Sequence, residues 1–335
     1  MAETMREILT SLFSPEARAA VAGGDVARIP ALWRQAAESG LFGLRVAETL
    51  GGLGLEWEAT LAVLSECGRV LLPGPWSDQM GYLPALLAEA PATAGVAGAL
   101  VAGELVAVRP SRVGRLSARP AGDGGWCLTG RWLQPYATLG ATALLPLPDA
   151  GVALLAGDLA MADLVPVAPL DPLVPTAWVT VRDRVVAADA VLPLTPAVHA
   201  AATTAAALVT GAYLTGVAAA LLEQTLGHVK QREQFGRPLG SFQAAKHQVV
   251  DMYLELELMR SSLEAAVAPA LPAAERAALV DSVARSFPRR CRRVAEKAFH
   301  LHGAMAFAWE TGLHLFLRAA KSHELAAAVS LEVSV

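Results

Sequence analysis

The sequence predicts an α+β protein in which a small β domain separates two helical regions. Apolar residues recur at helical spacing in residues 1–103 and again from residue 191 onward. Between them, short apolar stretches alternate with proline and glycine clusters, a pattern typical of a small β-sandwich or barrel. We therefore predict an N-terminal helical domain (1–103), a middle β domain (104–190) and a C-terminal four-helix bundle (191–335).

The N-terminal region contains two recognisable helices joined by an irregular link. Residues 29–40 predict a helix, because proline suits its first turn and glycine its end. A short extended piece, Leu44–Val46, precedes a glycine-rich link at residues 51–54. The second helix covers about Trp57 to Cys67, and the run Leu72-Pro73-Gly74-Pro75 ends it.

The other two regions contain short strands, of which four stand out, and four helices. The predicted strands are Leu105–Arg109, Trp126–Leu133, Ala141–Leu147 and Trp178–Arg182. The predicted helices run from Pro196 to about Lys230, from Phe242 to Val267, through an arginine-rich stretch to His302, and from near Thr311. A turn at Gly236–Gly240 joins the first two of these helices.

Composition indicates a chain that buries much of its surface. Hydrophobic residues make up 54% and charged residues 17%, and the mean hydropathy is +0.42. The run Ala190–Leu222 has no charged residue, but it contains Pro193, Pro196 and His199 and is rich in alanine and threonine. We expect a helix buried in a bundle or oligomer there, and no membrane span.

Charge and cysteine content argue against a nucleic-acid-binding protein and against a metal site built from cysteines. The net charge of −4 gives no electrostatic surface for nucleic acid. Cys67, Cys127 and Cys291 are far apart and lack the spacing of metal ligands, so we expect free thiols in a reducing compartment and no metal site. The N-terminus has early charges and no long apolar segment, so no secretory signal is predicted, and a cytoplasmic location is expected.

Several segments, in order along the chain, resemble the acyl-CoA dehydrogenase family. They are residues 32–54, Glu66–Pro75, Arg232–Leu239 with Phe242-Gln243, and His302 through Arg318. The resemblance covers nearly the whole chain. It implies the acyl-CoA dehydrogenase fold, an FAD cofactor and the α,β-dehydrogenation of an acyl-CoA thioester.

The resemblance also implies a cofactor half-site. In the family, the arginine after the long helix reaches across a dimer interface to the pyrophosphate of a flavin held mainly by the neighbouring subunit, and a guanidinium fork suits two phosphate oxygens. Arg232 takes this role here, and Phe235 would pack near the adenosine half. The same half-site would include Gln234, Leu239, Phe242 and Gln243, with His300 (where a glutamine is common) and Gly303 at the second cofactor contact. Alternatively, Arg232 and Arg237 only cap the long helix, whose C-terminal carbonyls favour cations.

The usual catalytic glutamate is missing from both positions that the family uses. One position corresponds to Ala327, within Leu325–Ala328, and the other to about Ala206 on the long helix. A general base must reach the substrate's α-proton, so we predict no catalytic residue in this chain. Glu310 and Glu324 are the alternative bases of a rival interpretation, although Glu310, beside Trp309, favours a structural role.

The half-site for the flavin ring also departs from the family. The Thr-Glu-Pro-like loop is replaced by Val108-Arg109-Pro110-Ser111-Arg112-Val113-Gly114. The Trp-Ile-Thr-Asn-like strand is replaced by Arg131-Trp132-Leu133-Gln134-Pro135-Tyr136, in which Pro135 cannot donate a backbone hydrogen bond. The glycine motif at the second contact has become Gly303-Ala304-Met305-Ala306, which replaces close-approach glycines with side chains.

Other charged and titratable residues favour structural roles. The arginines at 285, 289, 290, 292 and 293 could meet a CoA phosphate, but such a run is more often a solvated helix face or an oligomer rim. His314 and His323 are isolated histidines on a helix, which are usually packed or exposed.

This combination of kept and lost features resembles the smaller chain of heteromeric α2β2 acyl-CoA dehydrogenases from bacteria that degrade steroid side chains. The expected partners are a second family member forming a heterotetramer, an acyl-CoA substrate and an acceptor resembling electron-transfer flavoprotein. Two alternatives remain open: a homomeric flavoenzyme with an unusual base, and a flavin-free scaffold, cyclase or hydratase of the same fold.

Overall fold

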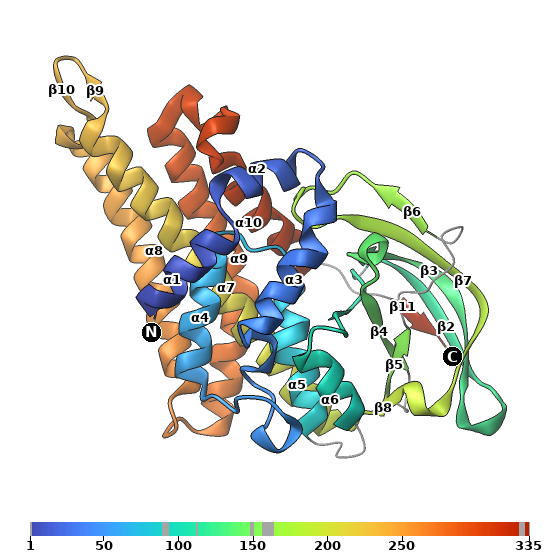
Figure 1. Cartoon of the computed structure of the whole chain (residues 1–335). Coiled ribbons are helices and arrows are strands. Elements are labelled where there is room, and N and C mark those ends of the chain that lie inside the picture. The colour runs from blue at the N-terminus through green and yellow to red at the C-terminus, as the bar shows by residue number, and fades with distance from the viewer. Residues whose placement is uncertain are drawn as a thin grey trace. The chain divides into compact units, whose positions relative to one another are not determined.

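The computed structural model describes residues 2–88, 94–111, 113–147, 151–155, 164–327 and 332–334. The chain forms two compact units, each assembled from segments that are distant in sequence (Figure 1). Unit 1 contains Met1–Gly24, Trp57–Leu72 and Ala207–Ala327, and unit 2 contains Asp25–Glu56, Pro73–Ala206 and Ala328–Val335. The three consecutive domains predicted above divide the chain differently and stay a prediction.

Unit 1 is helical. Its helices are α1 (Ala2–Leu12), α2 (Pro15–Ala22), α4 (Trp57–Arg69), most of α7 (Pro196–Gln231), α8 (Gln243–Val267), α9 (Ala273–His302) and α10 (Leu313–Ala327), with short 3-10 turns η10 (Leu239–Ser241), η11 (Gly303–Phe307) and η12 (Trp309–Thr311). Helices α7 to α10 are the four helices predicted for the C-terminal region. Where the sequence predicted an end, the observed end lies within two residues of it.

Helix α7 is buried for most of its length. Two glycines explain how α4 and α7 pack backbone to backbone: a Cβ on Gly68 would lie 1.9 Å from the carbonyl oxygen of Tyr213, and a Cβ on Gly216 would lie 1.8 Å from that of Ser65. By length and composition α7 could also cross a bilayer, but 83% of its most apolar window is buried inside the protein. This burial agrees with the core helix expected from the sequence.

Unit 2 joins short helices to two β-sheets. Its helical segments are α3 (Ile29–Glu38), the π-helical turn η4 (Asp78–Tyr82), α5 (Leu83–Ala88), α6 (Ala94–Val101), and the 3-10 turns η1 (Val26–Arg28), η2 (Leu41–Gly43), η3 (Glu48–Leu50), η6 (Gly122–Gly124), η7 (Ala137–Leu139) and η9 (Ala188–Ala190). One sheet has the order β1-β4-β5-β8, and the other has the order β11-β2-β3-β7-β6. The strands are β1 (Ala107–Val108), β2 (Gly114–Pro120), β3 (Trp126–Pro135), β4 (Thr142–Leu147), β5 (Gly151–Leu155), β6 (Leu164–Val167), β7 (Thr176–Val186), β8 (Val191–Pro193) and β11 (Glu332–Ser334).

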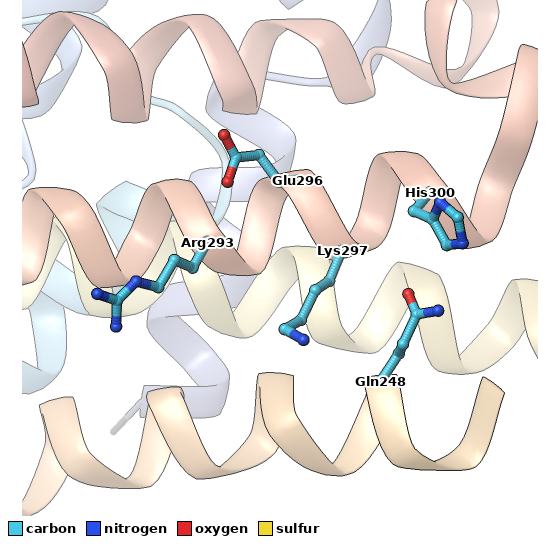
Figure 2. Close-up of a pocket in the computed structure, with 5 residues that line it drawn as sticks. All are labelled: Gln248, Arg293, Glu296, Lys297 and His300. Atoms are coloured by element: carbon cyan, nitrogen blue, oxygen red, sulfur yellow. The ribbon is translucent and has the colours of Figure 1, made fainter. Parts of the chain in front are cut away.

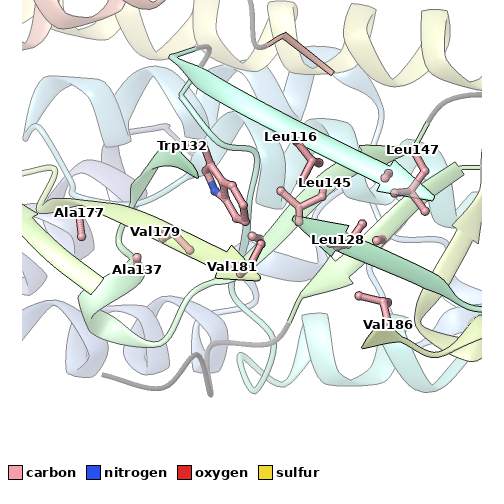
Figure 3. Packing of buried hydrophobic residues seen from close by; sticks show 13 residues of the cluster. Leu116, Leu128, Trp132, Ala137, Leu145, Leu147, Ala177, Val179, Val181 and Val186 are labelled. Carbon is pink, nitrogen blue, oxygen red and sulfur yellow. The ribbon is translucent and has the colours of Figure 1, made fainter. Parts of the chain in front are cut away.

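The two sheets share one apolar core, as the prediction of a sandwich requires. The core is centred on Trp132, which is fully buried, and Figure 3 shows side chains from both sheets converging on it. Leu116 and Val179 come from one sheet, and Leu145 and Ala153 come from the other. The four predicted strands all exist, while strands β2, β5, β6, β8 and β11 were not predicted.

The extended piece predicted at Leu44–Val46 is wrong, because this segment forms turns. The Leu44 carbonyl accepts a hydrogen bond from the Leu55 amide (2.8 Å), and the Val46 carbonyl accepts one from the Gly54 amide (2.8 Å). The glycine-rich link folds back on the segment, and this non-local pairing is invisible to local periodicity.

Candidate functional site

A β-hairpin follows α7 and carries four of the eight predicted cofactor residues, Arg232, Gln234, Phe235 and Leu239. Strands β9 (Glu233–Gln234) and β10 (Arg237–Pro238) pair antiparallel and are joined by Phe235 and Gly236. These two residues have φ values of +52° and +76°, as a tight two-residue hairpin turn requires. Glycine adopts this conformation freely, whereas phenylalanine is strained in it. Strain held at an exposed tip is a feature of binding sites.

The hairpin is anchored at its base and exposed at its tip. The Arg232 amide donates to the His228 carbonyl (2.8 Å), and the Leu239 amide donates to the Arg232 carbonyl (2.7 Å). Phe235 is 93% exposed, and Figure 1 shows the hairpin extending beyond the ends of α7 and α8. The tip of the hairpin therefore presents a large aromatic side chain to solvent.

The structure brings six of the eight predicted cofactor residues together at this end of unit 1. The Phe235 ring meets the Phe242 ring edge to face (6.1 Å between centroids), and the Arg237 guanidinium lies over Phe242 (4.1 Å). Gln243 begins α8 and its amide nitrogen is 2.9 Å from a His247 ring nitrogen. The six residues are Arg232, Gln234, Phe235, Leu239, Phe242 and Gln243.

The other two predicted residues lie at the C-terminal end of α9. His300 is exposed on the last turn, and Gly303 follows it at φ +59°. His300 shares an open groove of about 420 Å³ with Gln248 of α8, so it faces the same helix that the hairpin leads into. The assignment of these eight residues to a cofactor remains a prediction.

The groove between α8 and α9 contains charged residues that the sequence analysis did not place in the site. Figure 2 shows Arg293 and Lys297 on the side of α9 that faces α8, in line with His300. Lys297 pairs with Asp251 (2.8 Å), and Arg293 pairs with Glu255 (3.2 Å). The signal was present in the sequence, because positions 293, 297 and 300 share one helix face.

The arginine-rich run of α9 is mostly engaged in ion pairs. Arg290 pairs with Glu255 of α8 (2.6 Å), Arg285 pairs with Asp281, and Arg292 pairs with Glu296 and Glu324. These contacts favour the structural interpretation of the run over a CoA phosphate site.

Neither family position for the catalytic glutamate offers a carboxylate. Ala206 is 4% exposed in a core cluster with Tyr82 and Leu83, and a Cβ on Gly81 would lie 2.9 Å from its Cα. Backbone packed this closely leaves no room for a longer side chain. Ala327 is exposed at the end of α10, and Ala328 lies outside the described residues.

Glu324, one of the two alternative bases, is poorly suited to accept a proton. Glu324 accepts a hydrogen bond from Lys321 (2.7 Å) and lies 3.0 Å from Arg292, and these contacts lower its pKa. A lowered pKa makes a carboxylate a weaker base. Glu310 lies exposed on η12.

The two isolated histidines of α10 are packed. His314 meets the ring of Trp309 (4.6 Å), and His323 meets the ring of Tyr213 (5.8 Å). Burial lowers the pKa of His323 to about 4, so its ring is neutral at pH 7.

The segment that replaces the family's ring-contacting strand is closed by its own hydrogen bonds. The fully buried Gln134 side chain accepts from the Trp132 indole (2.9 Å) and donates to the Val108 carbonyl (3.1 Å). The Leu133 amide donates to the Val113 carbonyl (3.0 Å), and Pro135 has no amide to donate. These polar groups are therefore already satisfied within unit 2.

The loop that replaces the Thr-Glu-Pro motif is bound to η4. Arg109 pairs with the buried carboxylate of Asp78 through its side chain (2.5 Å) and its amide (2.8 Å). Its guanidinium also covers the Tyr82 ring at 4.3 Å. Arg112 of the same loop lies outside the described residues.

Comparison with known proteins shows that the chain belongs to the acyl-CoA dehydrogenase family, a family of oxidoreductases. The family's N-terminal domain matches residues 1–90 and its C-terminal domain matches residues 197–327. Acyl-CoA dehydrogenase IpdE2 of Mycobacterium tuberculosis is 31% identical over 95% of this chain and 89% of its own length. The predicted fold is thereby confirmed.

Among the solved structures that share the fold are the following two. A variant of the Tcur3481–Tcur3483 steroid ACAD aligns with a TM-score of 0.79 and 26% identity, over 96% of this chain and 91% of its own. A chain of the ChsE4–ChsE5 complex from Mycobacterium tuberculosis aligns with a TM-score of 0.82 and 24% identity, over 98% of this chain and 93% of its own.

Proposed function

We propose that this chain is a subunit of a heteromeric FAD-dependent acyl-CoA dehydrogenase and that it completes a flavin site held mainly by a second family member. Bound FAD supplies the acceptor for the hydride that leaves the β-carbon of the acyl-CoA. This chain contributes the hairpin that begins at Arg232, and the partner contributes the carboxylate that takes the α-proton. An acceptor resembling electron-transfer flavoprotein then reoxidises the complex.

The observation that carries the proposal is the exposed hairpin. Its tip residue Phe235 is 93% exposed at a strained φ, and Arg232 lies in the exposed part of the chain beside it. An aromatic ring and a guanidinium suit an adenosine and a pyrophosphate, respectively. A hairpin that packs so little against its own chain leaves these side chains available to bind another molecule.

The two half-sites differ in how well they fit a flavin. The hairpin presents side chains to the outside, which fits a cofactor held by another subunit. The segment around Gln134 does not fit the ring of a flavin held by this chain, because its donors are already bound to Val108 and Val113. No reaction step is therefore assigned to this chain's own ring site.

The relatives support a heteromeric partner and a steroid substrate. Both solved structures named above carry the names of two proteins, and one is called a steroid ACAD. We extend these properties to this chain: the partner is a second acyl-CoA dehydrogenase subunit in a heterotetramer, and the substrate is the CoA thioester of a steroid side chain.

The test is the visible spectrum of the tagged chain, purified alone and again with whatever family member it captures in its host. We expect no stoichiometric FAD on the chain alone and bound FAD in the complex. A yellow homo-oligomer of this chain alone would favour a homomeric enzyme. Absence of flavin from every complex would favour a flavin-free scaffold or cyclase.

A further inference from the structure

Two histidine rings stack where the C-terminal ends of α7 and α9 meet. The ring centroids of His228 and His302 are 4.1 Å apart, their planes are inclined by 23°, and both side chains are partly buried. The His228 carbonyl holds the amide of Arg232 at the base of the hairpin (2.8 Å). His302 immediately precedes Gly303. The pair therefore joins the two parts of the predicted cofactor half-site.

Each ring interacts with the last turn of α9. The Nδ1 atom of His302 lies 2.8 Å from the Ala298 carbonyl oxygen, and because a carbonyl only accepts, Nδ1 carries the proton. The Leu301 backbone acts on the His228 ring in the direction that raises its pKa, the sign expected when a ring N–H faces a carbonyl. The final carbonyls of a helix lack partners within the helix, so a ring N–H at the position of His228 is placed to cap α9 from the neighbouring helix.

The surroundings of the pair favour neutral rings. Burial lowers the pKa of both histidines, and the charges of His302 and Arg232 lower the pKa of His228 further, against the opposing effect of the Leu301 backbone. Lys230 and His300 are the other cationic or titratable side chains within two residues of the pair on these helices.

The sign of the pH dependence follows from these lowered pKa values. A histidine whose pKa is lower in the folded state contributes stability that is complete above its ordinary pKa of about 6.5 and is lost as the pH falls. Protonation of both rings would also bring two positive charges close together, where their repulsion opposes stacking.

We propose that the His228–His302 pair is a clamp that positions the two parts of the flavin half-site, the hairpin Arg232–Leu239 and the turn His300–Gly303, relative to each other. Neither histidine contacts the cofactor in this proposal, so both are positioning residues. The inference rests on the proposed function, because only a bound flavin needs these two parts in register. Acidification is expected to open the clamp.

The first test is a titration of the full-length chain with 13C-labelled histidine rings, followed by NMR from pH 8 to pH 5. We expect the two rings to titrate below the ordinary histidine range and to depend on each other. His302→Phe keeps a stacked neutral ring and should shift the titration of His228 to higher pH. Independent titration at the ordinary value would overturn the clamp.

The second test is hydrogen exchange of residues 232–239 and 301–307 in the full-length chain at pH 7.5. His228→Phe keeps a ring but cannot donate to Leu301, so exchange should rise about fivefold in both segments, the size expected for one net hydrogen bond. His228→Gln, which restores a donor, should restore protection, and His199→Gln in unit 2 is the control. Unchanged exchange of both segments in His228→Phe would overturn the proposed clamp.

The third test separates the clamp from the proposed function. In the complex captured with its partner, His302→Phe should retain FAD at pH 5.5 better than the wild type, while Arg232→Ala should lose FAD at every pH. If Arg232→Ala loses FAD but the histidine variants behave as wild type, the clamp is wrong and the proposed function stands. If Arg232→Ala also retains FAD, the proposed function fails whatever the histidines do.

Discussion

Residues 232–239 and residues 131–135 are predicted, from the family resemblance, to correspond to two parts of a flavin site, and their polar groups are used differently. The hairpin keeps its side chains exposed and even holds Phe235 at a strained φ of +52°. The β3 segment turns its polar groups inward, with Gln134 fully buried between Trp132 and Val108. The comparison shows that one segment leaves its polar groups available to another molecule, while the other uses them within its own fold.

The largest expected effect is on the free energy of unfolding, and it differs between Ala206 and Ala327, the two positions where the family's glutamate is missing. Ala206→Glu buries a carboxylate in a packed core, which should cost about 3–5 kcal/mol, because a buried charge without a partner is strongly destabilising. Ala327→Glu lies on an exposed helix end and should change stability by less than about 0.5 kcal/mol. Urea unfolding measures both variants. Equal stability of the two would contradict the packing described for α7 and η4.

The second prediction tests whether the hairpin holds the flavin. Arg232→Ala should weaken flavin retention in the complex by on the order of 2–5 kcal/mol if the pair with pyrophosphate is desolvated. Flavin remaining after dialysis is the measurement. Arg285→Ala, which removes an arginine from the exposed face of α9, is the matched control. Equal retention in both variants would leave Arg232 with only the helix-capping role.

Removal of the closing side chain in β3 should have a smaller effect. Gln134→Ala removes the hydrogen-bond partner of the Trp132 indole and of the Val108 carbonyl, and unsatisfied buried groups cost about 1–3 kcal/mol each. We expect a loss of about 2–4 kcal/mol in urea unfolding, against less than about 0.5 kcal/mol for the exposed Gln243→Ala. A neutral Gln134→Ala would show that this segment is not closed by the glutamine.

The smallest effect concerns the tip of the hairpin. Phe235→Gly removes the strain of a positive φ, whereas Phe235→Ala keeps it, so the glycine variant should be more stable than the alanine variant by about 1 kcal/mol. Both variants should bind the partner more weakly than the wild type, as co-purification would show. If Phe235→Gly is more stable and both variants still bind the partner as well as the wild type does, Phe235 is not part of the interface.

The sequence predicted helices α3, α4 and α7 to α10 well, because each carries its own periodicity and stop signals, whereas α1, α2, α5 and α6 were not predicted individually. The end of α9 at His302 and the start of α7 at Pro196 were placed correctly for this reason. The hairpin lies in the segment that carries the family motif, between the two helices that the sequence predicted on either side of it. Gly236 supplies part of the turn signal, and the family resemblance supplies the rest.

Features that depend on non-local contacts could not be predicted in the same way. The turn at Leu44–Val46 forms because residues 53–55 fold back onto it, and the bridge from Gln134 to Val108 joins residues that are 26 positions apart. The stack of His228 on His302 joins two helices that are separated along the chain by all of α8. No local sequence pattern predicts contacts between residues that are so far apart in the chain.

The most direct test of the central claim is the bleaching of flavin absorbance by acyl-CoA in the purified complex. We predict that replacing the partner's catalytic carboxylate with its amide leaves flavin bound but slows bleaching by about 10²–10⁴-fold, the usual contribution of a general base. Glu310→Gln and Glu324→Gln in this chain should leave the rate within about twofold. If the partner variant bleaches at the wild-type rate while one of these two variants does not, the base lies in this chain and the account is wrong.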